Sequence, residues 1–120
     1  MQLNMENYGQ DRMIVVSASR IDAVQAIDFK DKFRNAVAGS EGRVVLDLTA
    51  VAFIDSSGLG ALVASMKTLG VNRKLELCGL QSNVEKVFRL TRLDSVFKVH
   101  SNAATVRASL GVDDSQSLAG

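Results

Sequence analysis

The chain alternates short β-branched runs with longer segments of helical periodicity, and this alternation limits its fold more than any other feature. Strands are expected at residues 13–19, 43–48, 74–78 and 97–100, with an edge strand or a frayed terminus at 2–8. Helices are expected at residues 23–38, 57–69, 83–91 and 102–110. Strands that alternate with helices form a mainly parallel sheet, and the first two strands are close enough in sequence for an antiparallel hairpin. The sequence therefore predicts one α/β domain with a mixed sheet of four to five strands and about four helices.

The composition excludes several classes of function. With 14 Lys and Arg against 13 Asp and Glu, the chain lacks the charge that captures nucleic acid. One His (His100) and one Cys (Cys78) cannot build a Cys/His zinc site or an internal disulfide framework. The sequence has no run of about 20 apolar residues and no signal-peptide pattern. We therefore expect a cytoplasmic protein without metal, cofactor or membrane contact, with its core at about residues 10–110 and a flexible tail at 112–120.

The first predicted helix begins after Asp22, whose carboxylate is suited to capping the free backbone N–H groups. Ala26, Phe29 and Phe33 recur at helical spacing and predict the buried stripe. Val24 and Ile27 lie beside that stripe and have two interpretations. They either widen the core face or contact a partner.

The segment from Phe53 to Gly60 joins a strand to the second predicted helix, at the edge where open α/β sheets build their sites. Gly58 and Gly60 each cost a helix up to about 1 kcal/mol relative to Ala. Either the backbone packs tightly there or a partner approaches closely. Ser56 or Ser57 is expected to cap the helix. Leu59, Leu62, Val63, Met66 and Leu69 form the expected core stripe, and an opposite face of small residues includes Gly58, Ala61 and Ser65.

Ser56 has a second interpretation as a phosphorylation site. A phosphate there would lie at the positive end of a helix and would add about −1.5 to −2 charge units. Beside Asp55 it would concentrate negative charge on the surface and repel a docked partner. Such a site works as a switch without catalysis by the chain itself. Catalytic candidates are few, because a lone His100 and a Cys78 within an apolar strand are more often structural.

The run VVLDLTAVAFIDSSGLGALV resembles the signature of STAS domains, and the element order over about residues 10–110 fits that family. In size and motif the chain is similar to the bacterial anti-sigma-factor antagonists of the family. The resemblance implies a partner-switching protein, not an enzyme. Its unphosphorylated form would bind a GHKL-type serine-kinase anti-sigma factor and so release the sigma factor. The kinase would then phosphorylate Ser56, and a PP2C-type phosphatase would restore the active form.

The expected binding surface combines the segment around Ser56, the small-residue face and the start of the first helix. Its members are Asp22, Val24, Ile27, Asp55, Ser57, Gly58, Gly60, Ala61 and Ser65. Many antagonists carry a Gly-Glu-Leu-Asp-like turn where this chain has Ser-Arg-Ile-Asp, so Arg20 replaces an acidic residue. This departure bears on which partner is bound. We expect a monomer when the protein is free.

The sequence is also compatible with two other functions. The chain is alternatively a STAS subunit of another assembly, such as a lipid-transport accessory, a stress-sensing complex or a small-ligand-binding module. Direct nucleotide binding is the weaker alternative. Gly58 and Gly60 begin a GxGxxG pattern, but Val63 takes the place of its third Gly, and no Lys follows Gly60 as in a P-loop.

Overall fold

The computed structural model describes residues 1–111. The predicted tail at 112–120 lies outside the described residues. The strands are β1 (Gln2–Tyr8), β2 (Asp11–Ser17), β3 (Arg20–Ile21), β4 (Val44–Asp47), β5 (Phe53–Ile54), β6 (Glu76–Cys78) and β7 (Lys98–His100). The helices are α1 (Ala23–Val37), α2 (Ser56–Thr68), α3 (Ser82–Leu90) and α4 (Ala103–Ser109), with a 3₁₀ turn at Leu93–Ser95.

Five strands form one mixed sheet in the order β1-β2-β4-β6-β7. β1 and β2 are antiparallel, and all the other neighbours in this sheet are parallel. This confirms the predicted fold class, including the hairpin at the start of the chain. Gly9 has a φ of 64°, and its freedom in the left-handed region allows the two-residue turn that closes the hairpin.

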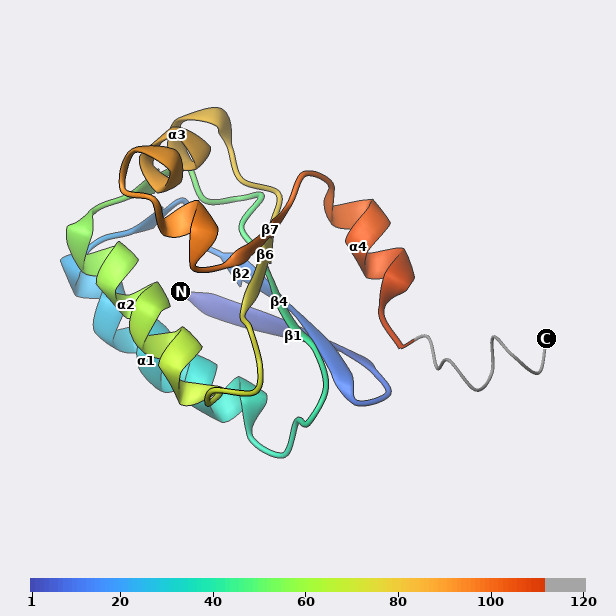
Figure 1. Cartoon of the computed structure of the whole chain (residues 1–120). Helices are drawn as coiled ribbons and strands as arrows, with labels where there is room; N and C mark the ends of the chain where they lie inside the picture. The colour runs from blue at the N-terminus through green and yellow to red at the C-terminus, as the bar shows by residue number, and fades with distance from the viewer. Residues whose placement is uncertain (112–120) are drawn as a thin grey trace.

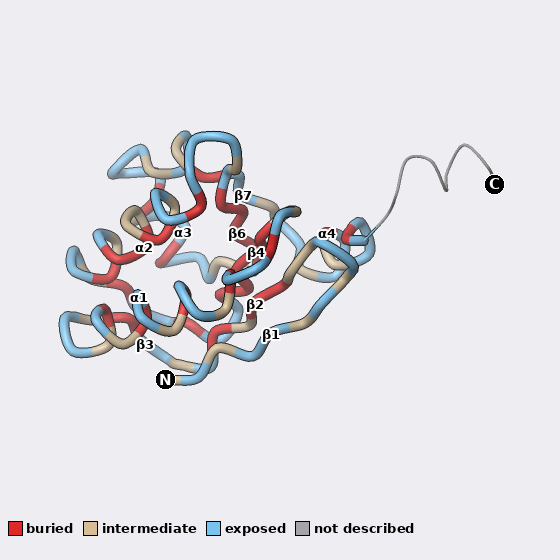
Figure 2. Tube along the Cα trace, turned by 90° about the horizontal axis from the view of Figure 1, so that it is seen from below, coloured by how far each residue is buried: buried red, intermediate tan, exposed pale blue. Residues whose placement is uncertain are grey.

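The two faces of the sheet are covered differently. α1, α2 and α3 lie on one face, and α4 lies on the other (Figure 1). The main core fills the space between the three helices and the sheet, where the buried residues gather in Figure 2. Phe29 and Phe33 of α1 stack there with ring centroids 5.9 Å apart. A smaller cluster, which includes Met13, Val45 and Cys78, lies under α4.

Two short strands form a separate sheet that sequence periodicity did not predict. β3 pairs with β5 in parallel, with Arg20 opposite Phe53 and Ile21 opposite Ile54. Each strand has two residues, which is too short to show an alternating pattern. The pairing is nevertheless important for the site, because α1 begins directly after β3 and α2 begins directly after β5.

Candidate functional site

The β3–β5 pair brings the starts of α1 and α2 to the same end of the molecule. Besides the strand register, the backbone N–H of Asp55 donates to the carbonyl of Ile21 at 3.3 Å. The N-cap residues of the two helices, Asp22 and Asp55, therefore follow directly on paired strands. Two segments that lie more than thirty residues apart in sequence thus form one local surface.

The two helix starts are capped by carboxylates. Asp22 Oδ1 accepts from the backbone N–H groups of Val24 and Gln25, both at 3.1 Å, which confirms the predicted cap of α1. Asp55 Oδ1 accepts from the N–H of Gly58 at 2.9 Å. The prediction that a serine caps α2 is therefore wrong. Asp55 has the extended backbone of a cap residue, and α2 has already begun at Ser56.

Because Asp55 serves as the cap, the hydroxyls of Ser56 and Ser57 are released from that structural role. Both residues are exposed. Ser56 is the first residue of α2, in the turn where backbone N–H groups lack a partner within the helix and the helix dipole is positive. The local backbone therefore favours an anion, although Asp55 already places one negative charge beside it.

The small residues of α2 face inward, which corrects the expected binding surface. Gly58, Ala61 and Ser65 are buried, on the side of α2 that packs toward α1 and β3. A Cβ atom on Gly58 would lie 2.2 Å from the carbonyl oxygen of Ile21. Ser65 is 2% exposed and donates its hydroxyl to the Ala61 carbonyl at 2.8 Å. Small side chains are needed here because the neighbouring backbone comes so close, so these three residues cannot form a docking face.

Gly60 faces the other way. It is exposed, and an added Cβ atom would meet nothing within 4 Å. Of the two explanations that the sequence allows for a glycine in this turn, tight packing therefore applies to Gly58 and not to Gly60. The close approach of a partner at Gly60 stays a prediction.

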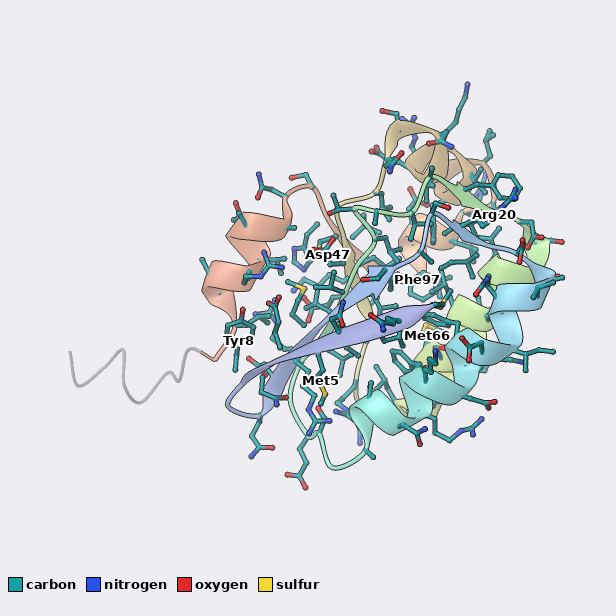
Figure 3. The ribbon with its side chains drawn as sticks, turned by 180° about the vertical axis from the view of Figure 1, so that it is seen from behind. Met5, Tyr8, Arg20, Asp47, Met66 and Phe97 are labelled. Atoms are coloured by element: carbon teal, nitrogen blue, oxygen red, sulfur yellow. The ribbon has the colours of Figure 1, made fainter. Side chains whose placement is uncertain are left out.

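Apolar side chains are exposed around the starts of both helices. Val24 is 79% exposed and Ile27 is 65% exposed, so the interpretation that they widen the core is wrong. Phe53 of β5 is also partly exposed, and the Arg20 guanidinium lies 5.2 Å above its ring centroid. Figure 3 shows Arg20 at the end of the molecule far from α4. We call this surface the Ser56 rim and define it by Arg20, Asp22, Val24, Ile27, Phe53, Asp55, Ser56, Ser57 and Gly60.

The other polar side chains singled out in the sequence lie on the α4 side of the sheet. Glu76, which sequence analysis did not single out, is buried there. Arg43 donates to both its carboxylate oxygens, at 2.8 and 2.9 Å, and Nε2 of His100 lies 2.7 Å from Oε1. Burial raises the pKa of the Glu76 carboxyl, but the hydrogen bonds from Arg43 and His100 outweigh it and hold the pKa below its ordinary value. His100 therefore belongs to a structural ion-pair cluster.

Asp47 and Cys78 also have structural surroundings. Asp47 Oδ1 accepts from the Thr49 N–H at 2.9 Å, and the residue is buried under Arg107 of α4. Burial, together with the nearby charge of Asp47, raises the pKa of the Cys78 thiol to about 12. The thiol therefore stays protonated and packs as a small apolar group, as expected.

Within residues 1–111, no group of three or more His, Cys, Asp or Glu side chains is placed to hold a metal ion. None of the helices in that range has the length and apolar character needed to span a bilayer.

Comparison with known proteins identifies relatives of the whole domain. The family model described as the STAS domain matches residues 2–106. An anti-sigma-B factor antagonist from Listeria monocytogenes is 32% identical over 91 residues, which cover 74% of this chain and 79% of that protein. Its name is that of a regulatory protein rather than an enzyme.

Solved structures show the same fold. An anti-sigma factor antagonist from Mycobacterium paratuberculosis superposes with a TM-score of 0.78 at 26% identity, covering 91% of this chain and 92% of that one. A STAS domain protein from Planctomyces limnophilus, described as an anti-sigma-factor antagonist, gives a TM-score of 0.79 at 20% identity. That match covers 92% of this chain and 98% of the other.

Proposed function

We propose that this chain, which belongs to the STAS domain family, is a cytoplasmic anti-sigma-factor antagonist that works by partner switching. In its unphosphorylated form it binds a serine-kinase anti-sigma factor of the GHKL type and so frees the sigma factor. The kinase transfers the γ-phosphoryl group of ATP to the Ser56 hydroxyl, which breaks the complex and leaves ADP. A PP2C-type phosphatase hydrolyses the phosphoserine and restores the binding form.

One observation carries this proposal. The Ser56 hydroxyl is exposed at the first residue of α2 and is not used as the cap, because Asp55 fills that role. A kinase can therefore reach the hydroxyl without unfolding the helix. The 32% identity to a named anti-sigma-B factor antagonist supports the same function. The alternative, a STAS subunit of a different assembly, is not favoured by the names of these relatives.

The Ser56 rim supplies a physical basis for binding before phosphorylation. Val24, Ile27 and Phe53 place exposed apolar surface around the serine, and its removal from water favours association. Gly60 lets a partner come close to the backbone of α2. Arg20 stands over Phe53 as a cation within this apolar surface, and a partner with an acidic group opposite it would be favoured.

Phosphorylation opposes this association by adding negative charge to the surface. A phosphate adds about −1.5 to −2 charge units at neutral pH. It would stand next to Asp55 and close to the start of α1, where Asp22 caps the helix. A partner that excluded water from the apolar rim would then have to bury this added charge. The cation of the rim, Arg20, already pairs with Asp22 at 3.6 Å, so this burial is costly. The switch therefore needs no rearrangement of the domain.

The phosphorylation site can be tested with matched serine variants. The chain is incubated with its cognate kinase and ATP, and phosphate incorporation is followed by intact-protein mass. We expect a single phosphate on the unmodified chain, none on Ser56→Ala, and normal incorporation on Ser57→Ala. Both serines are exposed in the same turn, so the two variants differ only in which hydroxyl is lost. Incorporation into Ser56→Ala with loss in Ser57→Ala would contradict the assignment.

A further inference from the structure

The two edge strands of the main sheet are protected to very different extents. β7 has three residues and carries Lys98, and short edges with lysine discourage pairing with another chain. β1 has seven residues and contains no Lys, Arg or Pro. Its one charged residue, Glu6, accepts from Tyr8 Oη at 2.8 Å and from Arg107 Nε at 2.9 Å. β1 thus has none of the usual safeguards of an open edge.

The backbone groups that β1 turns outward follow from one hydrogen bond and the strand register. The N–H of Arg12 donates to Arg43 at 2.8 Å, so the backbone of Arg12 faces the segment that leads into β4. Backbone direction alternates along a strand, so Met13 faces β1, and its register partner Glu6 faces β2 in return. The N–H and C=O groups of Leu3, Met5 and Asn7 therefore point away from the sheet.

We propose that β1 is a self-association edge, where the β1 strands of two copies pair antiparallel about a two-fold axis through Met5. Outward-facing residues then meet one another, with Met5 opposite Met5 and Leu3 opposite Asn7. The two five-stranded sheets join into one continuous sheet. The pairing satisfies the open backbone groups of both edges and covers the Met5 side chain, which is 44% exposed. Figure 3 shows Met5 along β1 and Tyr8 at the end of the strand nearer α4.

The side chains of β1 fit the register centred on Met5 better than the two registers centred one residue to either side. Centred on Met5, the pairing sets the Glu6 carboxylate opposite the Asn4 amide. That amide donates one hydrogen to Ser17 Oγ at 2.9 Å and has a second hydrogen for the carboxylate. Centred on Glu6, two carboxylates would face each other. Centred on Asn4, the pairing would extend to Met1, whose carbonyl oxygen already accepts from Lys32. The strand is therefore complementary to itself in one register, which is what a two-fold interface requires.

This inference is independent of the proposed function. No residue of the Ser56 rim lies in β1, and β1 forms the edge of a different sheet from β3 and β5. A dimer formed at β1 would therefore present two separate Ser56 rims. It also replaces the monomer expected from the sequence with a monomer–dimer equilibrium, because one strand pair is a small interface.

Sedimentation equilibrium on the full chain, over a wide range of concentration, tests the proposal. We expect the unmodified chain to dimerise reversibly. In the proposed register, residue 5 of one copy lies opposite residue 5 of the other. Met5→Lys and Met5→Glu should therefore each weaken self-association by about fivefold or more, because each places like charges opposite each other. An equimolar mixture of the two variants should restore the dimer by pairing Lys with Glu.

The matched control is Val99→Lys, which adds the same charge at the partly exposed centre of the other edge strand, β7. We expect it to leave the dissociation constant unchanged. Circular dichroism of each variant checks that the fold is retained. An unmodified chain that stays monomeric throughout would overturn the proposal, even if β1 bound a strand of another protein. A dimer unaffected by Met5→Lys, or variants that fail to recover on mixing, would also overturn it.

Discussion

The inward and outward sides of the first turn of α2 show two different uses of glycine. Gly58 faces β3, where the Ile21 carbonyl leaves no room for a side chain. Gly60 is two residues further along and faces open space. Glycine weakens a helix at either position. On the inward side packing explains the choice, whereas on the outward side nothing within the described domain does. The fold therefore accounts for the inward side of the turn, and the proposed partner is our explanation for the outward side.

The largest predicted effect is on the inward side. Gly58→Ala should destabilise the domain by about 3 kcal/mol, because the new methyl group meets backbone rather than a movable side chain. Urea unfolding followed by circular dichroism measures the change. Gly60→Ala is the matched control, since it makes the same substitution in the same turn. Equal changes in the unfolding free energy for the two substitutions would show that the inward and outward sides of the turn do not differ.

Removing the cap at the start of this turn should lower the unfolding free energy by a smaller amount. Asp55→Ala removes the acceptor for the Gly58 N–H and should cost about 1 kcal/mol of unfolding free energy. Asp55→Asn keeps a side-chain oxygen at the same place, and asparagine caps helices as well as aspartate does. We therefore expect Asp55→Asn to have nearly unmodified stability in the same urea experiment. If the two variants lose equal stability, capping is not what Asp55 contributes.

On the outward side, Gly60→Ala should change stability in the opposite direction. The added methyl group meets nothing within 4 Å, so the better helix former should stabilise the domain by about 0.5–1 kcal/mol. The same variant should bind the kinase anti-sigma factor more weakly, because the backbone of α2 becomes less accessible. Calorimetric titration with the kinase measures that loss. A more stable variant with unchanged kinase affinity would show that Gly60 does not serve a partner.

The smallest effect on stability is expected at the exposed apolar residues of α1. The double variant Val24→Ser, Ile27→Ser should change the unfolding free energy by less than about 0.5 kcal/mol per site, because both side chains are mostly exposed. Its kinase affinity should nevertheless fall.

Val71→Ser is the control for this variant. Val71 is a fully exposed apolar residue just beyond the far end of α2. Its replacement should leave kinase affinity unchanged. If Val71→Ser weakens binding as much as the double variant does, the loss is not specific to the Ser56 rim.

The sheet and the helix caps could be predicted from sequence where the signal was local. β-branched runs located β2 and β4, and the leucine-containing run KLELC located β6, which begins two residues later than expected. Asp22 caps α1 as expected, because an Asx side chain before a helical stripe contacts backbone two or three residues away. Asn102 caps α4 in the same way, although the last helix was expected to include residue 102. The third helix is an exception. Ser82 and Glu85 fit a capping-box pattern, but α3 already begins at Ser82 and Gln81 precedes it without a side-chain cap.

Hydrophobic periodicity predicted only part of the orientation of α2, because Leu62 and Leu69 of the expected stripe are buried in the main core but the small residues are buried as well. This helix is apolar or small nearly all around, so the large stripe with Leu59 and Val63 competed with the small stripe. The size of the side chains decided which of them face α1 and β3. The small residues allow close approach to α1 and β3, while Leu59 and Val63 are partly buried and pack against the main core. Likewise, the burial of Glu76 depends on Arg43 and His100, which lie more than twenty residues away on either side.

The central claim is that one phosphate on Ser56 separates the chain from its kinase. The most direct test is to measure the affinity of the kinase anti-sigma factor for the unphosphorylated chain and for the chain phosphorylated at Ser56, by calorimetric titration at one salt concentration. The account predicts firm binding of the unphosphorylated form and binding at least about a hundredfold weaker after phosphorylation, since burying an uncompensated charge costs several kcal/mol. Equal affinities for the two forms would contradict it.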